Sequence, residues 1–313
     1  MTIASDIANR LSEDSQFARG MFATAVYEYG MGVVELFDDW GYRPGASAKI
    51  ELEVDLDSAE TYSEGDSLPA PIESTYIKPA FDYKHCRGVI RESGHERRTR
   101  GPNDEGARIR DPERKMKRAM AAIVYLIAKT FDDAATYGIE GIISETTYNF
   151  GDQSRSTYAK LQSDELSASS AAISTALLNK WITLAKNDPH GARVDYVLGS
   201  ATQVHKINEL MSGKLAAPDI GRPMALTPSD VRIDGAPLLL VPNLTTSILL
   251  GLTGVKSGNW GKIWNEANPG RYHVLDLGAA NADNPMNLQI STSLCIANDI
   301  PHRQTKLHTL STG

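Results

Sequence analysis

Strict alternation of apolar and polar residues marks the clearest strand in the first third of the chain. Residues 48–56, AKIELEVDL, alternate apolar with acidic side chains from Ile50 to Leu56, and a period of two is typical of a half-buried strand. An acidic, Pro-containing stretch follows before the chain returns through TYIKPAFDYKHCRGVIRE. We therefore predict a long two-stranded hairpin over 46–92, whose apolar face needs outside support. Because the segment is so acidic, we expect that support from another subunit.

The strongest helix signal lies in residues 111–138, DPERKMKRAMAAIVYLIAKTFDDAATYG. Its apolar residues recur at spacings of three and four, which indicates one buried stripe on a helix. Asp111 suits the N-cap, Pro112 the first helical position and Gly138 the residue after the last turn. We predict a helix over 112–137, roughly 39 Å long at a rise of 1.5 Å per residue.

The rest of the chain mixes helical and extended segments. Residues 4–42 favour a helical arm, which the breaker run at 43–47 ends. We further expect a helix near 164–187, a strand at 194–199, a helix at 200–213 capped by Ser200, a hairpin at 230–244 that turns at Asp234-Gly235, a loop at 251–270 and a strand at 286–299. No internal repeat interrupts this order.

Charge is unevenly distributed along the 313 residues, of which 41% are hydrophobic and suffice for a sizeable core. The net charge of −7 argues against a dedicated nucleic-acid-binding protein. Residues 1–80 contain five basic and fifteen acidic side chains, a balance of −10, whereas residues 84–118 contain twelve basic and six acidic ones, a balance of +6. Blocks of opposite sign predict surfaces that meet, within the chain or between copies.

Nothing in the sequence indicates secretion or a membrane. Cys86 and Cys295 lie too far apart for a metal or redox motif, which fits a reducing compartment without a disulfide framework. The N-terminus lacks a signal-peptide pattern, and the apolar stretches fall short of the ~20 residues needed to span a bilayer. We expect a soluble protein.

Two candidate motifs fail on the residues that their chemistry requires. GLTGVKSGNWGK at 251–262 has Lys256 where a P-loop needs glycine and Ile263 where it needs Ser or Thr. We interpret it as a flexible surface loop. HERRT at 95–99 has Thr99 where the zinc helix HExxH needs its second histidine.

Paired carboxylates give no better support for catalysis. The acidic pairs Asp38/Asp39 and Asp132/Asp133 are each adjacent in sequence, and neighbours on a helix do not face one another. We interpret both pairs as solvated charge. We therefore predict no catalytic residue, no cofactor and no metal site.

The basic block begins with HERRTRGPNDEGARIR at 95–110, whose Gly, Pro and Asn residues predict a loop. Cations at the start of the following helix oppose its dipole, at a cost of ~0.3–1 kcal/mol each, so we infer an anionic partner. Residues 84–118 contain no aromatic side chain, which argues against a nucleic-acid-binding surface. The acidic hairpin of another copy is therefore the better candidate for the anionic partner of the basic block. The candidate subunit-interface residues are Arg97, Arg98, Arg100, Arg108, Arg110, Arg114 and Lys115 on the basic side, and Glu51, Glu53, Asp55, Asp57, Glu60, Glu64 and Asp66 on the acidic side.

This order of arm, hairpin, basic loop, long helix, compact segment and late strand resembles the HK97-type major capsid protein of tailed bacteriophages, a fold shared with encapsulins. Two stretches, VDYVLGSATQVHKINEL and RIDGAPLLLVPNL, resemble stretches typical of such proteins. The resemblance implies an α+β, HK97-like capsid fold. It assigns residues 1–45 to an N-terminal arm, 46–92 to an extended β-hairpin loop, 93–150 and 286–313 to a peripheral domain with spine helix 112–137, and 151–285 to an axial α/β domain.

The resemblance also implies a function. Copies would assemble into pentamers and hexamers of an icosahedral phage head, formed in the host cytoplasm, that encloses double-stranded DNA without sequence specificity. The partners implied are the chain itself, a portal, a decoration protein and, since the chain begins directly with the arm, a separate scaffolding protein or none. Two alternatives stay open: an encapsulin-type nanocompartment shell, and a soluble enzyme that binds an anionic substrate through the arginine cluster.

Overall fold

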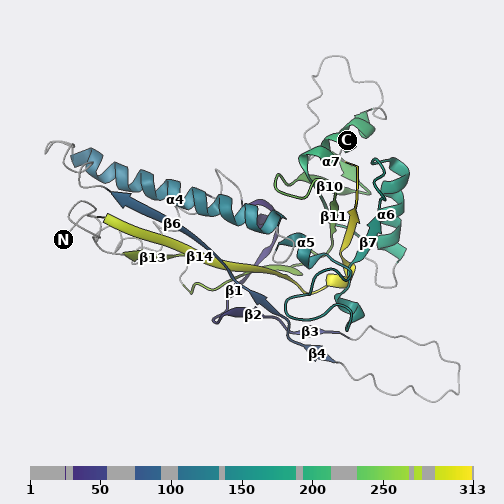
Figure 1. Cartoon of the computed structure of the whole chain (residues 1–313), viewed down its shortest axis with the longest axis horizontal. Coiled ribbons are helices and arrows are strands. Elements are labelled where there is room, and N and C mark those ends of the chain that lie inside the picture. Colours follow the sequence, from purple (N-terminus) through teal and green to yellow (C-terminus); the bar gives the residue numbers. More distant parts are fainter. Residues whose placement is uncertain are drawn as a thin grey trace. The chain divides into compact units, whose positions relative to one another are not determined.

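The computed structural model describes residues 25, 31–54, 75–92, 105–133, 138–187, 193–212, 231–267, 271–276 and 286–311. These residues form an α+β fold (Figure 1). The chain divides into two compact units. Unit 1 comprises Met1–Ala48, Asp82–Tyr137 and Gly261–Ile296, and unit 2 comprises Lys49–Phe81, Gly138–Trp260 and Ala297–Gly313. Each core therefore gathers segments that lie far apart in the sequence.

Unit 1 is built on a five-stranded sheet. Its strands are β1 (Asp38–Tyr42), β6 (Lys84–Glu92), β12 (Trp260–Trp264), β13 (His273–Asp276) and β14 (Met286–Asn298), with the short helix η1 (Gly32–Leu36) before β1. β14 pairs antiparallel with β6 and with β13, and β1 pairs parallel with β12. The predicted strand at 286–299 is confirmed. The predicted helical arm is wrong at 38–42, where a strand forms because Gly261 lets the Trp40 ring lie directly on the β12 backbone.

The long helix α4 (Glu105–Asp133) lies along β6 (Figure 1). Gly88 of β6 permits the close approach, since a Cβ atom there would stand 3.3 Å from Ala119 Cβ. The buried helix face carries Met116, Met120, Ile123, Ile127 and Phe131, the stripe that the sequence predicts.

The predicted start of this helix is wrong. α4 begins at Glu105, so the expected loop at 105–110 and the N-cap at Asp111 do not form. Glu, Ala and Arg in EGARIR are good helix formers, and Pro112 is accommodated inside the helix at the loss of one backbone hydrogen bond. The predicted end at 137 lies outside the described residues.

The hairpin forms, but it is shorter than predicted. β2 (Ser47–Lys49) pairs with β5 (Ala80–Asp82), and β3 (Leu52–Glu53) pairs antiparallel with β4 (Tyr76–Ile77). Residues 84–92 belong instead to β6, because β14 offers a longer partner.

The hairpin's apolar face is covered by its own chain. Ile50, Leu52 and Val54 are buried at 5%, 6% and 7% exposure, as the alternation predicts. The expectation that another subunit must cover this face is therefore wrong at the described base. Residues 55–74 lie outside the described part of the chain.

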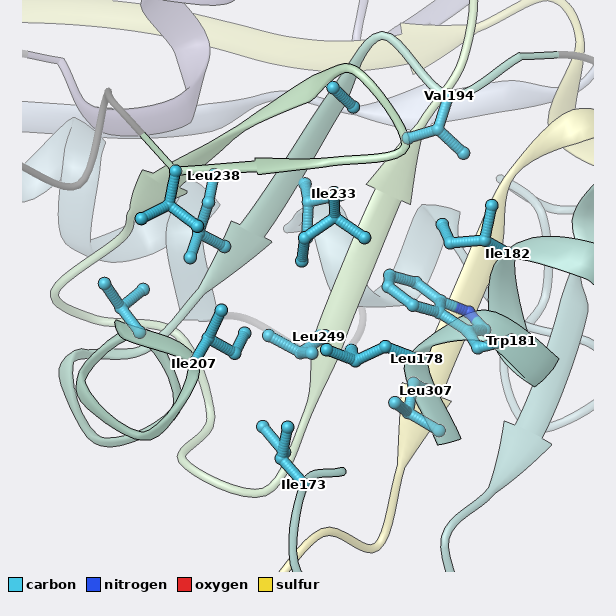
Figure 2. Packing of buried hydrophobic residues seen from close by; sticks show 14 of the residues in the cluster. Ile173, Leu178, Trp181, Ile182, Val194, Ile207, Ile233, Leu238, Leu249 and Leu307 are labelled. Atoms are coloured by element: carbon cyan, nitrogen blue, oxygen red, sulfur yellow. The ribbon is translucent and has the colours of Figure 1, made fainter. Parts of the chain in front are cut away.

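Unit 2 contains a six-stranded sheet in the order β7 (Asp164–Ser167), β15 (Thr305–His308), β11 (Leu249–Leu252), β8 (Tyr196–Gly199), β10 (Ala236–Leu240) and β9 (Arg232–Ile233). Its described helices are α5 (Ile139–Ile142), η2 (Ala159–Leu161), α6 (Thr175–Asn187), α7 (Ala201–Ser212) and η4 (Pro301–Arg303). Figure 2 shows Trp181 beside Leu178 and Leu307 in the core. Trp181 Nε1 donates a hydrogen bond to Thr305 Oγ1 at 2.8 Å, which fixes α6 against β15.

Several predictions for residues 164–270 are confirmed and two are wrong. The strand β8, the helix α7 and the Asp234-Gly235 turn are confirmed, with φ of 53° and 82° at the two turn residues, the left-handed values that such a turn requires. The helix predicted near 164–187 begins only at Thr175, because Asp164–Ser167 pairs with β15. The loop expected at 251–270 contains β12, and Gly251–Val255 are buried there.

Candidate functional site

The structure locates only part of the predicted interface. Arg97, Arg98 and Arg100 lie outside the described residues, as do Asp55, Asp57, Glu60, Glu64 and Asp66. Arg108 and Arg110 lie on α4, but their side chains are not described. Arg114, Lys115, Glu51 and Glu53 are described. The predicted contact between the arginines and an acidic hairpin therefore stays a prediction.

A row of cations follows the exposed face of α4. Arg114, Lys117, Arg118 and Lys129 are exposed, and we call them the basic row. Tyr125 stands on the same face and is 56% exposed. No acidic residue occurs between Arg114 and Lys129. The basic row is therefore an acid-free strip on a protein of net charge −7.

The basic row lies too far along α4 to interact strongly with the helix dipole. With α4 beginning at Glu105, Arg114 and its neighbours lie beyond the first turn, where the helix dipole has faded. The predicted dipole penalty is therefore wrong for these residues. A different cost replaces it, because like charges three and four apart, such as Arg114 with Lys117 and with Arg118, destabilise a helix by ~0.2–0.5 kcal/mol per pair.

The base of the hairpin is fixed to unit 2 by a small anchor around Ala80. The Ala80 N–H donates to Asp152 Oδ1 at 2.9 Å. The rings of Phe81 and Phe150 meet edge to face with centroids 5.1 Å apart. Gly151, at φ 61°, passes so close to Ala80 that a Cβ atom would stand 2.7 Å from its carbonyl oxygen. These contacts hold the described base of the hairpin against residues 150–152 of the same unit.

Electrostatics reinforce this anchor. Burial alone would raise the pKa of Asp152, but the hydrogen bonds from Ala80 and Gln153 and the charge of Lys49 outweigh it and hold that pKa below its usual value. On the ribbon itself, Lys78 Nζ lies 3.4 Å from Glu51 Oε2, and both side chains are more than half exposed. Such an exposed ion pair contributes little to stability.

In unit 1, buried groups hold the segment that precedes β1. The Val33 N–H donates to Asp132 Oδ1 at 2.8 Å, and Asp132 is only 1% exposed. The interpretation of Asp132 as solvated charge is therefore wrong, because this backbone segment covers it. Lys262 Nζ donates to the Phe37 carbonyl at 2.6 Å, and burial lowers the pKa of Lys262 even though nearby carboxylates, Asp39 foremost, act to raise it.

In unit 2, Arg155 organises the irregular chain between α5 and β7. Its guanidinium donates to the carbonyls of Tyr148 at 2.8 Å, Gly141 at 3.0 Å and Ile142 at 2.6 Å, and also to that of Leu161. Arg155 is 1% exposed. Burial lowers the pKa of Arg155 to about 10, against the opposing charge of Glu165, so the side chain remains charged at neutral pH.

The described part of the chain contains neither a group of metal ligands nor an activated thiol. No group of three or more His, Cys, Asp or Glu residues there could hold a metal ion. Cys86 and Cys295 are free and buried, and burial raises the pKa of Cys86 to about 11 and of Cys295 to about 12. Among the described residues, no helix has the length and apolarity needed to cross a membrane.

Comparison with known proteins gives structural neighbours but no sequence relatives. No protein-family model matches the chain, and no curated protein matches it. The capsid asymmetric unit of cyanophage A-1(L) matches with a TM-score of 0.61 at 10% identity, covering 88% of this chain and 91% of that chain. The holo-SrpI encapsulin complex from Synechococcus elongatus PCC 7942 matches with a TM-score of 0.57 at 9% identity, covering 90% and 87%. The virus-like particle from Pyrococcus furiosus matches with a TM-score of 0.52 at 10% identity, covering 94% and 98%.

Identities this low establish the fold and nothing finer. The neighbours are phage capsid proteins and encapsulins, so this chain has the HK97-type capsid fold. The predicted fold class is confirmed.

Proposed function

We propose that this chain is the major capsid protein of a tailed bacteriophage, a structural protein without enzyme activity. Copies would form the pentamers and hexamers of an icosahedral head in the virion, assembled in the host cytoplasm around packaged double-stranded DNA. One observation carries the proposal: shell-forming proteins match the fold over 88–94% of the chain. The predicted domain boundaries, scaffolding protein, portal and decoration protein belong to the same proposal.

An encapsulin shell is the second candidate, supported by the match to the cyanobacterial encapsulin complex. The two candidates differ in content, since a phage head encloses DNA and an encapsulin encloses cargo proteins. Nuclease-protected DNA inside particles supports the phage head, whereas co-purifying cargo protein supports the encapsulin. A soluble enzyme that uses the arginines for an anionic substrate would instead form a small oligomer.

The hairpin is the proposed contact between copies. Its base is fixed by the Ala80 anchor and exposes Tyr76 at 58%, while Glu51 and Glu53 line the same ribbon. The sheet of unit 1 offers a complementary surface on the face away from α4, where Arg87 is exposed and Val89 is 46% exposed. Apolar contact would supply affinity there, and opposite charge would set register and association rate.

Assembly of the purified chain tests this proposal. We expect uniform closed particles by size exclusion and negative-stain microscopy, with scaffolding protein supplied where needed. Many weak contacts repeated around a closed shell give a stable particle. A chain that remains monomeric or dimeric under these conditions would contradict the shell proposal.

Charge reversal tests whether the arginines at 97–100 are needed for contact between copies. Arg97→Glu, Arg98→Glu and Arg100→Glu together should abolish or strongly delay assembly while the circular-dichroism spectrum stays unchanged. The matched control places the same reversal at Lys180, Lys256 and Arg303 of unit 2, all exposed, and should assemble normally. Normal particles from the arginine variant would show that these residues do not receive the hairpin.

A further inference from the structure

The basic row on α4 has three features that together point to one kind of partner. Its cations are exposed on a single helix face, Arg114 repels Lys117 and Arg118 at helical spacing, and no acidic residue occurs between Arg114 and Lys129. Among the described residues, Arg114, Lys117, Arg118 and Lys129 have no ion-pair partner. An anionic partner would remove this repulsion.

The geometry of the basic row suits a linear polyanion. Arg114 and Lys129 are fifteen residues apart, which corresponds to roughly 22 Å along the helix axis. A DNA strand carries one phosphate per ~3.4 Å of duplex axis, so a strand lying along α4 would present several phosphates to the row. The cations therefore match a nucleic-acid backbone in both sign and shape.

The described base of the hairpin matches the basic row less well. Its exposed Glu51 already lies 3.4 Å from Lys78, and Glu53 is only partly exposed. Two short strands of two or three residues also provide less length than the row occupies. We therefore infer different partners for the two sets of cations. The hairpin of another copy remains the proposed partner of Arg97, Arg98 and Arg100, but not of the basic row.

Tyr125 supplies a group that the basic stretch itself lacks. Residues 84–118 contain no aromatic side chain, but Tyr125 stands between Arg118 and Lys129 on the exposed face of α4 and is 56% exposed. A tyrosine hydroxyl is among the groups that contact phosphate oxygens, and contacts of this type position a protein on DNA without reading its sequence.

We propose that the basic row of α4, with Tyr125, binds the phosphate backbone of the enclosed nucleic acid without sequence specificity. The inference rests on the proposed function, because a phage head encloses DNA. It assigns to α4 the surface of the subunit that faces the DNA.

The first test measures binding of the unassembled full-length chain to a short fluorescent DNA duplex over a range of salt concentrations. Arg114→Glu/Arg118→Glu should weaken binding at low salt by at least tenfold. Arg114→Gln/Arg118→Gln should reduce the slope of log K against log salt by about 1.8, at ~0.9 for each phosphate that is no longer neutralised. The matched control, Lys180→Glu/Arg303→Glu, changes the net charge equally at exposed sites of unit 2 and should bind nearly as well as the original chain.

Three outcomes would overturn the inference. The first is that the original chain does not bind the duplex. The second is that the control variant loses binding to the same extent. The third is that the arginine variant keeps its DNA binding but no longer binds a peptide covering residues 55–74. The last outcome would assign the row to the hairpin of another copy.

The second test separates this inference from the proposed function. Shells that form from Arg114→Glu/Arg118→Glu but retain less DNA than the control support both. Shells that retain DNA equally well refute the role of the row and leave the capsid proposal intact. If the original chain binds the duplex through the row but forms no shell, the capsid proposal fails and the nucleic-acid surface stands.

Discussion

Asp132 in unit 1 and Arg155 in unit 2 are buried charges of opposite sign that each hold a backbone segment in place. Each is 1% exposed, and each orders a segment outside the main sheets through the backbone. Asp132 accepts the N–H of Val33, whereas Arg155 donates to four carbonyls between Gly141 and Leu161. Hydrogen bonds from or to the backbone thus help to stabilise a buried charge of either sign.

The largest effect is expected at Arg155. Arg155→Met leaves several buried carbonyls without donors, so the free energy of unfolding should fall by about 3–5 kcal/mol. The free energy of unfolding of Arg155→Lys should lie between those of the original chain and Arg155→Met, because lysine keeps the charge but not the planar fork of donors. Denaturant unfolding of the unassembled chain measures both, with exposed Arg303→Met as control. A loss below that of the control would show that Arg155 does not hold this segment.

A smaller loss is expected at Asp132, whose truncation leaves the Val33 N–H without its acceptor. Asp132→Ala should lower the free energy of unfolding by about 1–3 kcal/mol and should speed amide exchange at Val33. Asp132→Asn keeps an acceptor oxygen and should lose less. Unchanged exchange at Val33 in the alanine variant would contradict the anchor.

Gly32 provides a further test of the contact between Asp132 and the segment before β1. It has φ 61°, and a Cβ atom there would overlap the Asp132 carboxylate. Gly32→Ala should therefore cost more with Asp132 present than in the Asp132→Ala background, where only a backbone cost of about 1 kcal/mol remains. A double-mutant cycle measures the difference, and strictly additive losses would argue against contact.

The exposed carboxylate Asp152 should show the smallest effect, and one that depends on pH. Its folded pKa lies below the ordinary 3.8, so it stabilises the hairpin base above that value, and the contribution is lost as pH falls through the folded pKa. Asp152→Asn should cost about 0.5 kcal/mol or less at neutral pH, because water screens the site. Amide exchange at Ala80 should be faster at pH 3 than at pH 6 in the original chain after correction for intrinsic exchange. The asparagine variant should show no such difference.

Elements with nearby partners or a long apolar pattern could be predicted from the sequence. Alternation from Ile50 to Val54 predicted the hairpin base, the apolar stripe predicted the centre of α4, and Asp234-Gly235 predicted a turn whose left-handed φ values require such residues. The order of these elements was enough to indicate the capsid fold.

Strand partners and buried polar contacts that involve distant segments could not be predicted from the sequence. β15 pairs with β7 and β11, which lie far away in sequence. The pattern of a four-residue strand with mixed polarity is too weak to predict such partners. The same holds for Asp132 and Arg155, which resemble surface charges until backbone from elsewhere covers them. Short-range pattern records local conformation and one-sided burial, whereas strand partners and buried polar contacts follow from how the whole chain packs.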